Sequence, residues 1–270
     1  MLARLVEKLL HVKGNILNIK FNVNGKDFQA YVPDDQGYVG IKDVLLNREY
    51  EYLSKFELSN FKGKRILDVG AHVGLYSLLA SAFAKEVIAI EPHPVNYLLL
   101  RINMIRNDVK NVICVKRALW YQKENTFLFD ANSSSSYSMF PDVISGFGHY
   151  VETTTLEEVV DRFGDIDLMK IDIESAEFTI FDRLEKSILN RIHNIVLEVH
   201  PSGSENVKIL SQAFRSSHAC IENFRTPISK TFRMYPVSVV GLFMPKALRY
   251  LTLGMSNMFG IKDRNLSVLF

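Results

Sequence analysis

The run Asp68-Val69-Gly70-Ala71-His72-Val73-Gly74-Leu75-Tyr76, which follows the apolar stretch Arg65-Ile66-Leu67, decides the fold. It has the order of a buried strand, a tight turn and the start of a helix. Gly70 and Gly74 can adopt positive φ angles and carry no Cβ that would block a ligand, and the first turn of the helix offers unpaired backbone N–H groups. This stretch therefore predicts a strand–turn–helix unit of the kind that binds nucleoside-type ligands.

An acidic residue follows at an informative distance. The run Glu86-Val87-Ile88-Ala89-Ile90 predicts a second buried parallel strand, and it ends at Glu91, about twenty residues after Gly70, where doubly wound folds place an acid that hydrogen-bonds a ribose diol. A dinucleotide fingerprint needs Gly-x-Gly-x-x-Gly, whereas only Ala71-His72-Val73 separates the two glycines here. The turn thus favours a cofactor without a pyrophosphate, and S-adenosyl-L-methionine fits. The alternative is a tight βα turn in another α/β protein.

Composition limits the function classes. The chain has 270 residues, 47% of them hydrophobic and 23% charged, with a net charge of +2, which suits one large α/β domain and gives no support for a nucleic-acid partner. Cys114 and Cys220 lack metal-ligand spacing, so we expect reduced thiols and no metal site. Neither Met1–His11 nor Val237–Met244 has the apolar length of a signal peptide or a membrane span, so we expect a cytoplasmic protein without a transmembrane segment.

The chain divides into three parts of one domain. Residues 1–60 are expected to form a hairpin, Ile16–Phe21 and Phe28–Val32 around Asn24-Gly25, and one or two helices within Ile41–Asn60 that brace the core. Residues 61–225 are expected to form the cofactor-binding core. Residues 226–270 are expected to contribute an inserted helical pair within Thr226–Arg264 and a final antiparallel edge strand, Asn265–Phe270; this C-terminal segment is also a candidate for homo-oligomer contacts.

The core alternates strand and helix patterns, which predicts a doubly wound, mostly parallel sheet with helices on both faces. The expected strands are Ile66–Asp68, Val87–Glu91, Val112–Lys116, Leu168–Asp172, Ile195–Val199 and Ala219–Phe224. The expected helices are Leu75–Lys85, Pro94–Asn107, Leu156–Phe163, Ala176–Leu189 and Glu205–Phe214. Ala131–Gly148, with its serine row Ser133–Ser136, is expected to be a loop over the top of the sheet, either a linker or a lid.

A second informative run is Leu168-Met169-Lys170-Ile171-Asp172-Ile173-Glu174-Ser175-Ala176-Glu177. Ligands of open α/β sheets bind beyond the carboxyl ends of the strands, where Asp172 and Glu174 emerge and where Glu198 and His200 follow another strand. Methyl transfer to a hydroxyl needs an aligned acceptor and a base that removes its proton. We therefore predict Asp172 and His200 as candidate bases and Glu174 as an orienting group, although His200 could equally be a hydrogen-bonded residue at a strand end.

These motifs, together with Ala89-Ile90-Glu91-Pro92, Asn96, Thr154-Thr155-Leu156-Glu157 and Leu197-Glu198-Val199-His200, resemble the FkbM family of S-adenosylmethionine-dependent methyltransferases over roughly Glu49 to Phe224. The resemblance implies the class I methyltransferase (Rossmann-like) fold, with a seven-stranded sheet and an antiparallel final strand. It also implies O-methylation of a saccharide, polyketide or similar small hydroxylated acceptor. Two residues depart from the family pattern, because His72 stands where Asn is common and Ser175 where Gly is usual.

The turn Gly70–Gly74 is called the glycine bend, or the bend, from here on. The resemblance implies that the bend surrounds the methionine portion of the cofactor. It also implies that Glu91 binds the ribose and that Pro92, Asn96 and Ala118 lie near the ribose or adenine. The residues expected around the methionine portion are Asp68, Gly70, Ala71, His72, Gly74, Tyr76 and Ser77. Two rival functions stay open at this point: an RNA methyltransferase, which would need a basic face, and a catalytically inactive cofactor-binding scaffold.

Overall fold

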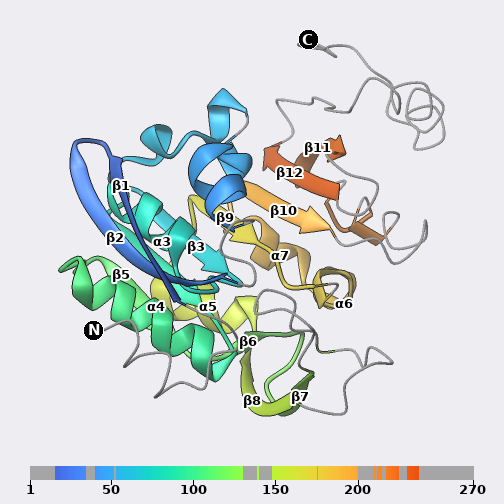
Figure 1. Cartoon of the computed structure of the whole chain (residues 1–270). Helices are drawn as coiled ribbons and strands as arrows, with labels where there is room; N and C mark the ends of the chain where they lie inside the picture. Colours follow the sequence, from blue (N-terminus) through green and yellow to red (C-terminus); the bar gives the residue numbers. More distant parts are fainter. Residues whose placement is uncertain are drawn as a thin grey trace.

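The fold is that of a computed structural model, which describes residues 16–34, 40–51, 53–129, 139, 148–174, 176–199, 209–210, 212–214, 217–224 and 230–236. Its main sheet has seven strands (Figure 1). They are β3 (Arg65–Val69), β4 (Glu86–Ile90), β5 (Val112–Val115), β9 (Leu168–Ile171), β10 (Ile195–Val199), β11 (His218–Phe224) and β12 (Lys230–Pro236). Their spatial order is β11-β12-β10-β9-β3-β4-β5. The five strands from β10 to β5 are parallel, and β9 pairs with β3.

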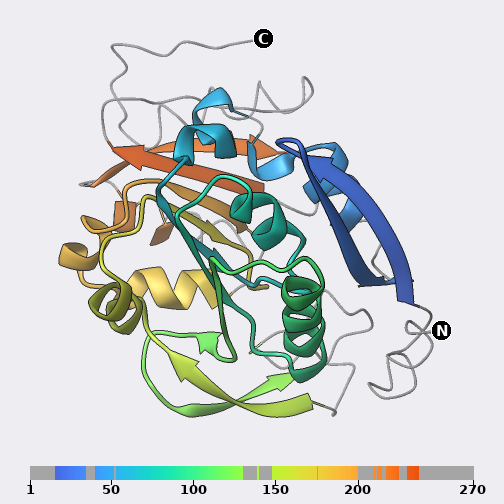
Figure 2. The ribbon, with the colours of Figure 1, turned by 90° about the vertical axis from the view of Figure 1, so that its left-hand side faces the viewer.

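The central strands are apolar throughout because both faces of the sheet are covered. Since successive side chains of a strand point to opposite faces, Ile66 and Val87 belong to one core and Leu67 and Ile88 to the other. The first core also contains α3 (Leu75–Ser81) and α4 (Pro94–Arg106), and the second contains α5 (Leu156–Phe163), α6 (Ala176–Arg183) and α7 (Lys186–Leu189). Figure 2 shows the two helical layers on either side of the sheet.

The expected N-terminal hairpin is confirmed. β1 (Ile16–Val23) and β2 (Lys26–Pro33) pair antiparallel, and the turn between them uses Asn24 at φ 52° and Gly25 at φ 76°, the positive values that a tight hairpin turn requires. The hairpin lies against α3 and α4 at the edge of the molecule (Figures 1 and 2).

Two asparagines at the C-terminal end of α4 fasten the hairpin, because their side-chain amides hydrogen-bond the backbone of β2 as a neighbouring strand would. Asn103 Oδ1 accepts from the Tyr31 N–H (2.8 Å) and its Nδ2 donates to Tyr31 O (3.0 Å). Asn107 does the same for Gln29, at 2.8 and 2.7 Å. The four residues from Asn103 to Asn107 advance about 6 Å along the helix and two residues of strand advance about 6.7 Å, so the spacings match. Asn103 also donates to Val73 O (2.8 Å), which joins the hairpin to the glycine bend.

The segment 41–60 forms short turns, so the prediction of one or two ordinary helices there is wrong. It contains a π-helical turn at Ile41–Leu46 and 3₁₀ turns at Glu49–Glu51, Ser54–Phe56 and Leu58–Phe61. Left-handed Arg48 (φ 49°) and extended Leu53 interrupt the helical path. The buried Glu51 carboxylate accepts from the Leu58 N–H (2.9 Å) and so replaces a backbone acceptor that a continuous helix would supply.

The prediction for the C-terminal part also needs correction. Residues 230–236, expected within a helical pair, form β12, which lies between β10 and β11 and is antiparallel to both. The antiparallel strand is therefore inside the sheet, and β11 is the edge. The prolines at 227 and 236 bound this strand, whose pairing on both sides decides its conformation. The expected final strand 265–270 and most of the expected loop 131–148 lie outside the described residues. The helix expected at 176–189 is divided at extended Glu185.

A three-stranded sheet follows β5 and was not predicted. It consists of β6 (Ala118–Leu119), β7 (Asn125–Phe129) and β8 (Gly148–Thr154), in the order β6-β8-β7. It lies at the end of the molecule away from β11 and β12 (Figures 1 and 2).

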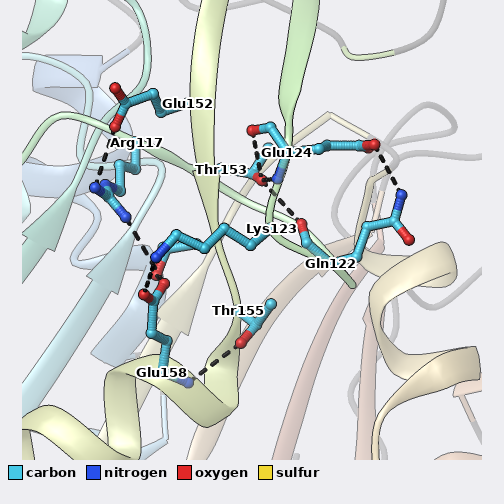
Figure 3. A network of polar contacts seen from close by, with 9 residues as sticks. Arg117, Gln122, Lys123, Glu124, Glu152, Thr153, Thr155 and Glu158 are labelled. Atoms are coloured by element: carbon cyan, nitrogen blue, oxygen red, sulfur yellow. Dashed lines mark hydrogen bonds and ion pairs between the residues drawn. The ribbon is translucent and has the colours of Figure 1, made fainter.

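Polar contacts join this small sheet to α5 (Figure 3). Glu158 contacts Lys123 Nζ (2.7 Å) and Arg117 Nη1 (3.8 Å), and its backbone N–H donates to the capping Thr155 Oγ1 (3.2 Å). The Thr153 hydroxyl accepts from the Glu124 N–H (2.7 Å). Such exposed ion pairs stabilise little individually, but together they hold the chain that carries Ala118 against the main sheet.

No helix in the described part of the chain is long and apolar enough to cross a bilayer.

The asparagine pair of α4 offers a test of how the hairpin is held. We expect Asn103→Ala to lower the free energy of unfolding by about 2–3 kcal/mol, because it leaves the buried N–H and C=O of Tyr31 without partners. Asn107→Ala is the matched control, since Asn107 is less buried and water can replace its amide. Denaturant unfolding measures both; equal losses would contradict this account.

Candidate functional site

The register of the parallel strands brings four motifs to one edge of the sheet. Val69 is paired with Ile90 and with Ile171, and Ile171 is paired with Leu197. The next residue of each strand or turn therefore emerges at the same level, and these residues are Gly70, Glu91, Asp172 and Glu198. In an open α/β sheet this carboxyl edge is where ligands bind.

A cavity of about 300 Å³ opens at this edge, at the lower end of the range for small-molecule sites. It is lined by the bend and by the strand ends, and also by the N-terminal segment 40–50. Its polar or charged lining residues are Asp43, Glu49, Tyr50, His72, Tyr76, Glu91, Asn96, Lys170, Asp172, Glu174 and Glu198. Within the described residues no group of three or more His, Cys, Asp or Glu side chains has a geometry that could hold a metal ion.

Glu91 faces the bend. Its Oε2 accepts a hydrogen bond from the His72 N–H (2.8 Å), and its Oε1 accepts from the His93 N–H (2.9 Å). His72 can present its N–H in this direction because it adopts a left-handed conformation (φ 52°). Burial raises the pKa of Glu91 to about 7, although the two backbone donors act in the opposite direction. A hydrogen-bond acceptor is thus fixed at the place where the fold would hold a ribose diol.

Gly70 is required by close packing as well as by its positive φ of 72°. A Cβ there would lie only 1.8 Å from the carbonyl oxygen of Asp172. The bend therefore passes directly over the end of β9, and the Asp172 N–H donates to Val69 O (3.1 Å) across the same junction. The contact keeps the bend and the second motif at a fixed separation.

Asp68 lies beneath the bend and is fully buried. Its Oδ2 accepts from the Ser77 hydroxyl (2.6 Å), and its Oδ1 is 3.5 Å from Lys170 Nζ. Burial raises the pKa of Asp68, while Lys170 and Ser77 act to lower it. Lys170 Nζ also donates to Gly70 O (2.8 Å). The ammonium therefore ties the core of the sheet to the bend.

Beside Asp172 the cavity gathers four polar groups from three parts of the chain: Tyr50, Lys170 with Asp172, and Glu198. Tyr50 Oη is 3.1 Å from Asp172 Oδ2 and 3.1 Å from Glu198 Oε2. Lys170 Nζ is 3.8 Å from the same Asp172 oxygen and 5.1 Å from the centre of the Tyr50 ring. Burial lowers the pKa of Lys170, but Asp68 and Asp172 act to raise it; the net shift is upward and Lys170 stays charged.

Most residues expected at the site lie along the cavity. They are Gly70, Ala71, His72, Tyr76, Glu91, Pro92, Asn96, Ala118, Asp172 and Glu174. Asp68, Gly74 and Ser77 do not line it: Asp68 and Ser77 bond to each other beneath the bend. A Cβ at Gly74 would lie 2.5 Å from Leu100 Cδ1, so that glycine serves helix packing. His200 lies outside the described residues.

Three residues of the site were not assigned from the sequence. Tyr50 gives no local signal, because its partners are more than a hundred residues away along the chain. Glu198 was placed at the correct edge without a role. Lys170 did carry a signal: it is a charged residue in an otherwise apolar buried strand, where charges are paired.

Comparison with known proteins relates this geometry to a family. The model of the methyltransferase FkbM domain matches residues 68–224. A curated relative, the 31-O-demethyl-FK506 methyltransferase FkbM of Streptomyces tacrolimicus, is 27% identical over 171 residues, which cover 51% of this chain and 66% of the relative. The chain thus spans slightly less than two thirds of that relative.

Two solved structures are similar at low identity. One, a methyltransferase FkbM from Methylobacillus flagellatus, is 13% identical with a TM-score of 0.48, covering 64% of this chain and 44% of that one. The other is a Streptococcus mutans methyltransferase in complex with SAH; it is 11% identical with a TM-score of 0.44, covering 68% of this chain and 97% of that one.

The contact beneath Gly70 yields a prediction. We expect Gly70→Ala to destabilise the protein by at least about 3 kcal/mol, because the strain of positive φ adds to a backbone collision. Gly63→Ala is the control: Gly63 has the same φ of 72° but nothing lies within 4 Å of its added Cβ, so only about 1 kcal/mol is expected. Thermal unfolding compares the two; equal shifts would show that the collision relaxes without cost.

Proposed function

The chain belongs to the methyltransferase FkbM family, and from this premise we propose that it binds S-adenosyl-L-methionine and methylates a hydroxyl group of a saccharide or secondary metabolite. The observation that carries the proposal is that Glu91 and Asp172 border one cavity at the carboxyl edge of the sheet. Glu91 supplies a diol acceptor and Asp172 a base, and the register of β3, β4 and β9 aligns them.

The residues present suit this cofactor. Glu91 is buried and aimed at the bend, which leaves its remaining lone pairs for the two ribose hydroxyls. The bend itself is free of bulky side chains at Gly70 and Ala71, where the methionine portion would pass. Asn96, Pro92 and Ala118 would border the ribose and adenine. Bound there, the cofactor supplies a methyl group that is already activated by its sulfonium.

The chain's own contribution to the reaction is alignment and proton removal. Asp172 would accept the proton of the attacking hydroxyl, and Glu174, in the left-handed turn after β9 (φ 51°), would orient the acceptor. The Lys170 ammonium near Asp172 favours the ionised carboxylate that a base needs. The absence of an Asn-Pro-Pro-Tyr or Asp-Pro-Pro-Tyr run, which would position a planar amino group, favours oxygen as the acceptor atom.

The ribose contact predicts a pH-dependent affinity. Because the pKa of Glu91 is about 7, the group becomes protonated as the pH falls through that value and loses an acceptor for the diol. We expect the affinity for S-adenosyl-L-methionine to fall about tenfold between about pH 8 and about pH 6. Isothermal titration calorimetry across this range measures it.

Glu91→Gln is the control for that titration, since its side chain cannot ionise. The variant should bind the cofactor weakly at every pH, and its affinity should lack the step near pH 7. Any step that survives in the variant comes from the cofactor or another group. Equal affinity of Glu91→Gln and the wild type above pH 8 would contradict the ribose assignment.

The proposed base yields a kinetic prediction. With methyl-labelled cofactor and fractionated cell extract, we expect Asp172→Asn to lower the rate of label transfer by about 10²–10⁴-fold while cofactor affinity changes little. The exposed Asp182→Asn of α6 is the matched control and should keep the full rate. Label in a ribonuclease-sensitive fraction, or full transfer by Asp172→Asn, would overturn the proposal.

A further inference from the structure

The Tyr50 hydroxyl lies between two carboxyl groups that it cannot satisfy alone. Its oxygen is 3.1 Å from Asp172 Oδ2 and 3.1 Å from Glu198 Oε2, both within hydrogen-bond distance. A phenol carries one proton and can donate it to one acceptor, while an ionised carboxylate has no proton to give. If both acids were ionised, the single phenol proton would have to serve both acceptors as a bifurcated hydrogen bond. A proton on one carboxyl group gives each of the two contacts its own donor.

Asp172 lies beside a cation and is open to the cavity. Lys170 Nζ lies 3.8 Å from the same Asp172 oxygen, and the Asp172 side chain is 28% exposed toward the cavity. Both a nearby cation and partial hydration favour an ionised carboxylate.

Glu198 has the opposite surroundings. Burial raises the pKa of Glu198 well above its usual range, and the neighbouring Asp172 and Glu49 raise it further. Lys170 acts the other way without reversing the shift. Burial and the Asp172 carboxylate hold the pKa of Tyr50 well above its ordinary value, so the phenol keeps its own proton. The donor order that fits is Glu198 to Tyr50 and Tyr50 to Asp172.

We propose that Glu198 is a permanently protonated carboxylic acid that donates to Tyr50, and that Tyr50 in turn donates to Asp172 and holds it as an oriented carboxylate at the acceptor end of the cavity. Tyr50 and Glu198 are thus positioning residues, which act on the reaction through Asp172. The arrangement of protons does not depend on the proposed function. Only the role of Asp172 as a base rests on that function.

This arrangement has a defined place in the reaction. In the proposed reaction Asp172 would accept the hydroxyl proton and later release it to solvent, while the bound S-adenosyl-L-methionine would supply the methyl group and leave as its neutral thioether. The Glu198 proton is not consumed. Its presence removes one negative charge from a region that, among the described residues, also contains Glu49, Asp68 and Asp172 near the ammonium of Lys170.

Carboxyl ¹³C NMR of protein labelled at aspartate and glutamate tests the proton positions without any substrate. Asp172→Asn and Glu198→Gln assign the two resonances by their loss. We expect the Glu198 resonance of the wild type to be that of a protonated acid through neutral pH, and the Asp172 resonance to be that of an anion. An ionised Glu198 at pH 7 would overturn the proposal.

Tyr50→Phe tests the link between the two acids. Removing the donor should raise the titration midpoint of Asp172 by about one pH unit, a tenfold change in its acid dissociation constant. Tyr76→Phe is the matched control, because Tyr76 packs edge-on against Tyr50 with a buried hydroxyl that donates to neither carboxyl group. It should leave the midpoint unchanged. An unchanged midpoint in Tyr50→Phe would reduce Tyr50 to a packing residue.

Glu198→Gln provides the second readout. Its neutral amide can still donate to Tyr50. The titration midpoint of Asp172 should therefore stay within a few tenths of a pH unit of the wild-type value, well below the effect of losing a hydrogen bond to a charged group. A large shift would mean that Glu198 acts as an anion and would overturn the proposal. Where label transfer is measurable, the acidic limb of its pH profile should move with Asp172 in Tyr50→Phe. Absence of any cofactor binding would instead refute the proposed function and leave the NMR result valid.

Discussion

The buried ammonium group of Lys170 is the interaction on which the site depends. It lies at the junction of β3 and β9, is 4% exposed, and contacts Asp68 Oδ1, Asp172 Oδ2 and the carbonyl of Gly70. A buried charge is tolerable only when it is paired and hydrogen-bonded. The strand register meets this condition by placing Lys170 opposite Asp68. One cation thereby pairs with the acid beneath the bend, fixes the bend above it and lies beside the acid at the cavity.

The parts of the fold that could be predicted from the sequence are those in which the local pattern and the tertiary contacts agree. The glycine bend needs positive φ at Gly70 and Gly74, and only glycine supplies it at low cost. The parallel strands are buried on both faces, so each one appears as a continuous apolar run that can be located in the sequence. Their carboxyl ends define one edge of the sheet, and Glu91 and Asp172, both expected at that edge, line the same cavity.

The remaining parts depend on contacts that no local pattern encodes. β12 alternates polar and apolar residues between two prolines, and its pairing with β10 and β11 decides that it is a strand. The turns at 41–60 depend on the Glu51 carboxylate, which accepts from a backbone N–H seven residues later. Asp68 precedes the glycines as a cofactor ligand would, yet its partners are Ser77 and Lys170. The sequence placed an acid at position 68, but its hydrogen-bond partners follow from the register of β3 with β9 and from the position of α3.

The acceptor end of the cavity is built differently from the cofactor end. The bend and Glu91 come within one strand–helix–strand unit, β3-α3-β4, and Asn96 lies in the first turn of α4, which follows directly. Tyr50, by contrast, belongs to the N-terminal segment, which reaches the cavity because the hairpin before it is fastened to α4 by Asn103. The same Asn103 bonds to Val73 in the bend. The two ends of the cavity therefore both depend on Asn103. Changes that loosen the hairpin should disturb Asp172 before they disturb Glu91, because Glu91 accepts its hydrogen bonds from the nearby backbone N–H groups of His72 and His93.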